Sequence, residues 1–73
     1  MSKLPRVSDR ECVAALQRAG FEVARQRGSH VVLRRDNPRA VVVVPNHREL
    51  DRGTLRAILL QAGLSTDEFV ELL

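Results

Sequence analysis

The 73-residue sequence contains no tryptophan, no tyrosine, two phenylalanines and a single cysteine. So few aromatic residues argue against a nucleic-acid module that stacks bases on an exposed sheet. One thiol cannot form an internal disulfide, which excludes a disulfide scaffold and suits a reducing cytoplasm. No apolar run is longer than that of 40–44, which is far shorter than the roughly 20 residues of a membrane-spanning helix. The segment 1–6 carries no apolar signal-peptide core, so we expect a cytoplasmic protein with no membrane partner.

Patterns that bind metals or cofactors are also missing. Cys12, His30 and His47 are scattered, without the spacing of a metal site. The sequence has no glycine-rich phosphate loop. Cys12 lies on the apolar stripe of a predicted helix, which favours a core position over a nucleophile. We therefore expect neither a metal nor a cofactor.

Positive charge is unevenly distributed. Residues 1–56 hold all 12 basic side chains and six of the nine acidic ones, a net charge of +6, whereas 57–73 hold three acids and no base. Every basic residue except Lys3 is arginine, the side chain best shaped for bidentate phosphate contacts. A basic face of this kind suggests nucleic acid or another polyanion. The alternative is an arginine-rich composition without a functional role.

Helix signals occur at both ends of the chain. Ser8 and Glu11 form a capping-box pattern that predicts a helix over about 8–19, ended by Gly20. Asp51 is expected to cap a second helix that runs to about 62 and ends at Gly63. A second capping box, Ser65-Thr66-Asp67-Glu68, predicts a short C-terminal helix.

The middle of the chain predicts three strands, over 21–27, 29–35 and 40–44, separated by Gly28 and a turn at 36–39. The four consecutive valines of the third strand are typical of a strand that is central or covered on both faces. The order α-β-β-β-α-α predicts one α+β domain over residues 1–73. We expect a three-stranded antiparallel sheet with helices on one face.

His30 lies near the start of the second predicted strand, and four arginines lie near it in the sequence: Arg25, Arg27, Arg34 and Arg35. A histidine in a cationic surface can cleave RNA without metal, because the 2′-hydroxyl already lies beside the phosphate. Imidazole, with an ordinary pKa of about 6.5, can accept a proton from that hydroxyl or donate one to the leaving oxygen. Neighbouring guanidinium groups stabilise the charged phosphorane. The alternative is a histidine that only hydrogen-bonds the end of its strand.

A turn centred at 37–38 pairs strand residues whose numbers sum to 75. This register places His30 opposite Pro45 and Gly28 opposite His47. Because alternate strand residues share a face, both imidazoles are expected on one side of the sheet. His47 follows a strand exit, where a purely structural role is the stronger alternative.

Three motifs, Arg-Gln-Arg-Gly-Ser-His at 25–30, Val-Pro-Asn-His at 44–47 and Leu-Asp-Arg-Gly-Thr-Leu at 50–55, resemble the HicA family of toxins from bacterial toxin–antitoxin pairs. Lys-Leu-Pro at 3–5 and Ala-Gly-Leu-Ser at 62–65 extend the resemblance over nearly the whole chain. One departure is Asp9, where such toxins often carry glycine after the capping serine.

The resemblance implies a fold like that of the double-stranded-RNA-binding domain and an activity as an mRNA interferase, a metal-independent endoribonuclease. It implies that His30 is catalytic, that no cofactor is needed and that the usual partner is a HicB-type antitoxin. The residues themselves add RNA-binding candidates around it: Arg25, Arg27, Gly28, Ser29 and Arg34. His47 is a weaker candidate for an accessory acid. The competing interpretations are a non-catalytic RNA-binding module that recognises A-form shape, and a degenerate, inactive toxin.

Overall fold

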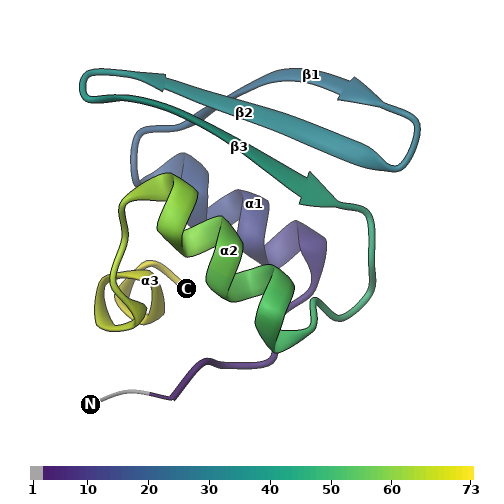
Figure 1. Cartoon of the computed structure of the whole chain (residues 1–73), viewed down its shortest axis with the longest axis vertical. Helices are drawn as coiled ribbons and strands as arrows, with labels where there is room; N and C mark the ends of the chain where they lie inside the picture. The colour runs from purple at the N-terminus through teal and green to yellow at the C-terminus, as the bar shows by residue number, and fades with distance from the viewer. Residues whose placement is uncertain (1–2) are drawn as a thin grey trace.

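The computed structural model describes residues 3–73 and contains six elements in the predicted α-β-β-β-α-α order (Figure 1). These are α1 (Asp9–Arg18), β1 (Glu22–Arg27), β2 (His30–Asp36), β3 (Arg39–Pro45), α2 (Arg52–Ala62) and α3 (Thr66–Leu72). Met1 and Ser2, which begin the segment without a signal-peptide core, lie outside the described residues. Within 3–73, no helix has the length and apolarity to cross a membrane.

Both predicted capping boxes are confirmed. The Ser8 hydroxyl accepts the Glu11 N–H at 3.1 Å, and the Ser8 N–H donates to the Glu11 carboxylate at 2.9 Å. Ser65 and Glu68 repeat this exchange at 3.1 and 2.8 Å. Gly63 ends α2 in the left-handed conformation, with φ of 71°, as its position after the apolar stripe predicts. The helix boundaries therefore follow from local hydrogen bonding.

The sheet forms one layer and the helices cover one of its faces (Figure 1). Helix α2 packs against β3, while α1 contacts β1, β3 and α3. The fully buried side chains of the core come from both layers: Phe69, Leu16, Leu33, Leu55, Ile58, Val42, Val44 and Cys12. The arrangement confirms an α+β fold like that of the double-stranded-RNA-binding domain, and it confirms Cys12 as a core residue.

The three strands are antiparallel in the order β1-β2-β3. The β2–β3 register is the predicted one, with His30 opposite Pro45. The β1–β2 ladder contains an irregularity that the sequence did not indicate, a bulge at Ala24 between Val23 and Arg25.

The prediction for the third strand is wrong in one respect. β3 is an edge strand, and only one of its faces is covered. Val42 and Val44 are buried against the helices, whereas Val41 and Val43 are 47% and 40% exposed on the other face. Four valines in a row make both faces of the strand apolar, but residues 3–73 form no further strand or helix that covers the second face.

Candidate functional site

The sheet face that points away from the helices carries most of the predicted site. In β2, Leu33 is buried and Val31 half-buried against the helices, so His30 and the other even-numbered residues point to the opposite side. We call this side the open face. Strand pairing assigns it Glu22, Arg25, Arg27, His30, Val32, Arg34, Asp36, Arg39, Val41, Val43 and Pro45.

The bulge at Ala24 decides which side of the sheet the β1 arginines occupy. Before the bulge, Val23 pairs with Leu33 and faces the helices. Continuing that register would pair Arg25 with Val31 and direct it to the same side. The extra residue shifts the pairing by one, so Arg25 lies opposite Val32 on the open face. The same shift places Arg27 directly opposite His30.

A two-residue turn, Gly28-Ser29, connects Arg27 to His30. Gly28 has a φ of 57°, which glycine adopts without the steric cost of a Cβ. The turn fixes Arg27 and His30 as neighbours whose Cβ atoms lie roughly 5 Å apart. An anion bound by the Arg27 guanidinium is therefore within reach of the His30 imidazole.

The open face is positively charged, with four arginines and two acids. Arg34 Nε lies 3.7 Å from Asp36 Oδ1, but both side chains are exposed. An exposed ion pair of this kind contributes little to the stability of the fold. Arg25 and Arg27 form no ion pair with any residue in 3–73 and remain available to a phosphate. Arg39 joins this face opposite Asp36; alternation from the predicted register would have identified it.

Arg35, which precedes the turn in the same arginine-rich stretch, lies on the covered face instead. Its Nε donates to the Pro38 carbonyl at 2.9 Å and its Nη2 to the Ala62 carbonyl at 3.3 Å. Its guanidinium carbon lies 4.6 Å from the centre of the Phe21 ring. Arg35 therefore ties the β2–β3 turn to the end of α2 and is not part of the open face.

His47 does not continue the sheet. Asn46 N–H donates to the Ser29 carbonyl at 2.6 Å, but His47 N–H donates to Pro45 at 3.0 Å, which turns the chain away. The expected pairing of His47 with Gly28 is therefore wrong, because the ladder ends at His30 and Pro45.

The loop that carries His47 is attached to the start of α1 instead. The His47 carbonyl accepts the Asp9 N–H at 3.0 Å. His47 also lies close enough to Asp51 to affect it: the pKa of Asp51 is lowered first by the hydrogen bond from the Thr54 N–H and, more weakly, by His47. The His47 backbone is therefore bonded to the start of α1, and its side chain lies near the N-cap of α2.

A hollow of about 450 Å³ lies between α1 and the β1–β2 hairpin. Its floor is apolar, formed by Val13, Ala14, Val23 and Val31, and its polar lining includes the side chains of Gln17, Gln26 and Asn46. The hollow forms only when α1 packs against the sheet, so no pattern of residues close in the sequence predicts it.

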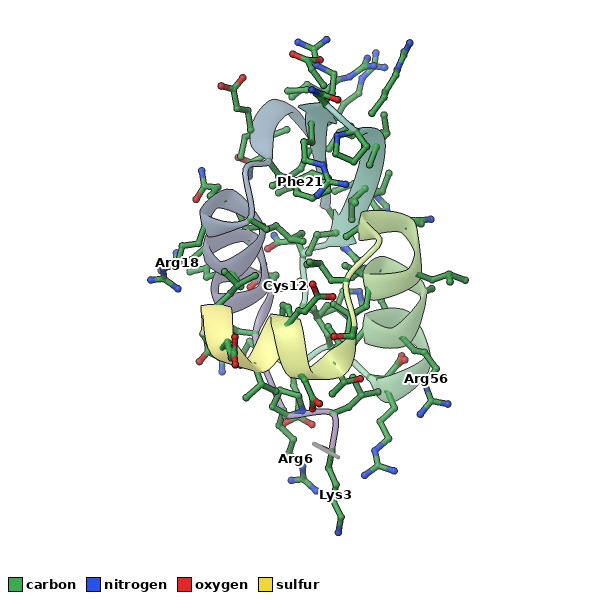
Figure 2. The ribbon with its side chains drawn as sticks, turned by 90° about the vertical axis from the view of Figure 1, so that its left-hand side faces the viewer. Lys3, Arg6, Cys12, Arg18, Phe21 and Arg56 are labelled. Atoms are coloured by element: carbon green, nitrogen blue, oxygen red, sulfur yellow. The ribbon has the colours of Figure 1, made fainter. Side chains whose placement is uncertain are left out.

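The remaining candidates for chemistry are inert. Burial raises the pKa of the Cys12 thiol to about 12, with a smaller contribution from Asp9, so it stays a protonated core side chain. Figure 2 shows it in the interior, between the helices. Within 3–73, no group of three or more His, Cys, Asp or Glu residues is placed to hold a metal ion.

The positive charge is not confined to the open face. Figure 2 shows Lys3, Arg6 and Arg56 pointing outward at the end of the molecule away from the sheet. The expectation of a single basic face is therefore too simple. Eight of the 12 basic residues are not on the open face, which is distinguished by having His30 among its four arginines.

These features define a class of protein: a small basic α+β domain, similar in fold to the double-stranded-RNA-binding domain, with a histidine among arginines on its uncovered sheet face. A family model for the HicA toxin of bacterial toxin–antitoxin systems matches residues 10–64, which include the whole sheet and α2. The chain belongs to the HicA toxin family. A comparison with curated proteins gives no match.

Proposed function

We propose that this chain is the toxin of a type II toxin–antitoxin system and that it cleaves mRNA as a metal-independent endoribonuclease. It acts in the cytoplasm until a HicB-type antitoxin binds it. The observation that carries the proposal is the position of His30, exposed on the open face and directly opposite Arg27.

In the proposed reaction, His30 accepts the proton of an RNA 2′-hydroxyl. The 2′-oxygen bonds to phosphorus and the bond from phosphorus to the 5′-oxygen breaks, giving a 2′,3′-cyclic phosphate and a 5′-hydroxyl. The proton for the leaving 5′-oxygen comes from protonated His30. Arg25, Arg27 and Arg34 hold the phosphate and stabilise its developing charge.

The Gly28-Ser29 turn gives RNA access to His30. An added Cβ at Gly28 would meet nothing within 4 Å, so the space beside the turn is open. The Ser29 carbonyl is engaged by Asn46, which holds the turn against the end of β3. We infer that the RNA passes close to the protein backbone at Gly28 and Ser29. Neither residue takes part in proton transfer.

His47 is the weaker candidate for the acid that protonates the leaving oxygen. A His47→Gln variant with an unchanged cleavage rate and an unchanged pH–rate profile would remove it from the mechanism. His47→Gln tests this role separately from that of His30, because it removes only the other imidazole.

The deciding experiment is cleavage of a labelled mRNA by the purified chain in excess EDTA, beside His30→Ala. We expect the wild type to cleave and His30→Ala to lose at least about 100-fold in rate, the usual contribution of a positioned acid–base group. RNA affinity, measured by fluorescence anisotropy, should change little because the arginines remain.

Two results would contradict the proposal. A folded His30→Ala variant that cleaves at the wild-type rate would exclude His30 as the catalytic residue. RNA binding without cleavage by the wild type would instead support a non-catalytic module, since the open-face arginines suit phosphate binding by themselves.

A further inference from the structure

The two edges of the sheet are built differently. The β1 edge is bulged at Ala24 and carries Glu22, Arg25 and Arg27, features that prevent another strand from pairing with it. The β3 edge has none of these protections from 40 to 44, where it is regular, uncharged and free of proline. Such an edge is a ready template for a strand from another molecule.

The hydrogen-bonding pattern shows which β3 groups point outward. Asn46 N–H donates to Ser29, and Pro45 has no N–H, so Pro45 occupies a position that does not bond to β2. Bonding alternates along an antiparallel pair. Val41 and Val43 therefore direct their N–H and C=O groups away from β2.

No other strand in 3–73 takes up these groups, because β3 ends the sheet and pairs with β2 alone. The side chains of Val41 and Val43 are also among the most exposed large apolar groups of the chain. The β3 edge, which we define as Val41 and Val43, thus presents unpaired backbone groups together with apolar side chains.

The surroundings of the β3 edge indicate what occupies it. Arg34 lies opposite Val41, and Arg39 lies at the start of the strand on the same face. An added strand therefore needs apolar side chains beside the valines and acidic ones near the arginines. A second copy of this chain fits less well, because its own β3 strand contains no acidic side chain to meet these arginines.

We propose that a partner protein docks on the β3 edge by adding one extended strand in which apolar and acidic residues contact the open-face side. The inference rests on the proposed function in that the partner is taken to be the antitoxin. Neighbouring strands lie about 4.8 Å apart, so the added strand stands two strands, about 10 Å, from β2. From there the partner narrows RNA access to His30 without having to contact the imidazole.

Amide hydrogen exchange tests the contact directly. In the free chain, the amides of Val41 and Val43 should exchange rapidly, whereas those of Val42 and Val44 are protected by β2. Addition of a purified HicB-type antitoxin, the proposed partner, should protect Val41 and Val43 as well. Slow exchange of Val41 and Val43 in a self-associated free chain would instead assign the edge to a second copy and overturn the proposal.

Charge variants test the chemistry of the added strand. Val43→Asp should weaken antitoxin binding at least about tenfold, because it adds desolvated like charge to the contact. Val43→Lys should bind more tightly than Val43→Asp. Val23→Asp is the matched control, because Val23 is 43% exposed on the other edge strand. The antitoxin affinity of this variant should stay within about twofold of the wild-type value.

Two further outcomes overturn the inference: failure of the antitoxin to bind, and binding that leaves the Val41 and Val43 amides in rapid exchange. RNA cleavage, measured separately, distinguishes failure of the docking inference from failure of the proposed nuclease function. A chain that cleaves RNA and binds antitoxin elsewhere keeps its nuclease role. A chain that is protected at β3 but cleaves nothing keeps the docking site and loses that role.

Discussion

Two neighbouring arginines show how strand alternation assigns opposite roles to the same side chain. Arg34 and Arg35 are adjacent in β2 and therefore point to opposite faces of the sheet. Arg34 is exposed beside Asp36, where it can reach a phosphate. Arg35 is half-buried, donates to two backbone carbonyls and lies over Phe21. The two arginines contribute equally to the charge of the sequence, but only Arg34 lies on the open face.

We expect alanine substitutions to separate these roles. Arg35→Ala should lower the free energy of unfolding by about 2–3 kcal/mol, because two hydrogen bonds and a cation–π contact are lost. Arg34→Ala should change it by less than about 0.5 kcal/mol, yet weaken RNA binding and reduce its salt dependence. Urea unfolding and salt titrations of RNA affinity measure the two effects. Equal stability losses in both variants would refute the distinction.

At the scale of elements, the β1–β2 hairpin assembles the site. Its bulge brings Arg25 and Arg27 to the open face, and its two-residue turn sets His30 opposite Arg27. The turn needs a residue that accepts positive φ, and Gly28 supplies it.

Gly28→Ala should therefore destabilise the chain by about 1 kcal/mol and reduce RNA cleavage. The cost is conformational, because an added Cβ at this position has free space around it. Gly28→Asn should cost less, since asparagine tolerates positive φ. Gly53→Ala is the control: Gly53 lies in the first turn of α2 without positive φ, so alanine should be neutral or stabilising in thermal unfolding. Equal stability of Gly28→Ala and wild type would show that the turn is not strained by a side chain.

At the scale of the whole molecule, α3 completes the core although it lies outside the family match at 10–64. Phe69 of α3 is fully buried. Arg18 Nη1 also donates to the Leu72 carbonyl at 2.7 Å, which holds the end of α3 to α1. A chain of this size buries only about 60% of its unfolded surface, so each large core side chain contributes a substantial share of stability.

Phe69→Ala should cost about 3–5 kcal/mol. A chain of 73 residues is expected to have a total stability of roughly 4–11 kcal/mol, so the variant should be close to unfolding. Leu60→Ala, at a site 84% exposed on α2, should change stability by less than about 0.5 kcal/mol. Circular dichroism with urea titration compares them, and a Phe69→Ala chain as stable as Leu60→Ala would show that α3 is dispensable.

Local chemistry predicts most of this fold. Three kinds of feature depend only on residues a few positions away: the capping serines, the glycines after α1 and α2, and the turn at 37–38. Their effects can therefore be predicted from the sequence. The same locality explains why the pairing of His30 with Pro45 could be predicted, since a tight turn sets the register of the strands it joins.

Tertiary packing decided the rest. The sequence by itself determined the six elements, the antiparallel β2–β3 register and the presence of a histidine among arginines. Only the folded chain decided that Arg35 turns inward, that the bulge turns Arg25 and Arg27 outward, and that His47 leaves the sheet for the start of α1. It also decided that β3 is an uncovered edge, because which face of an apolar strand is buried depends on how many other elements the chain has to cover it.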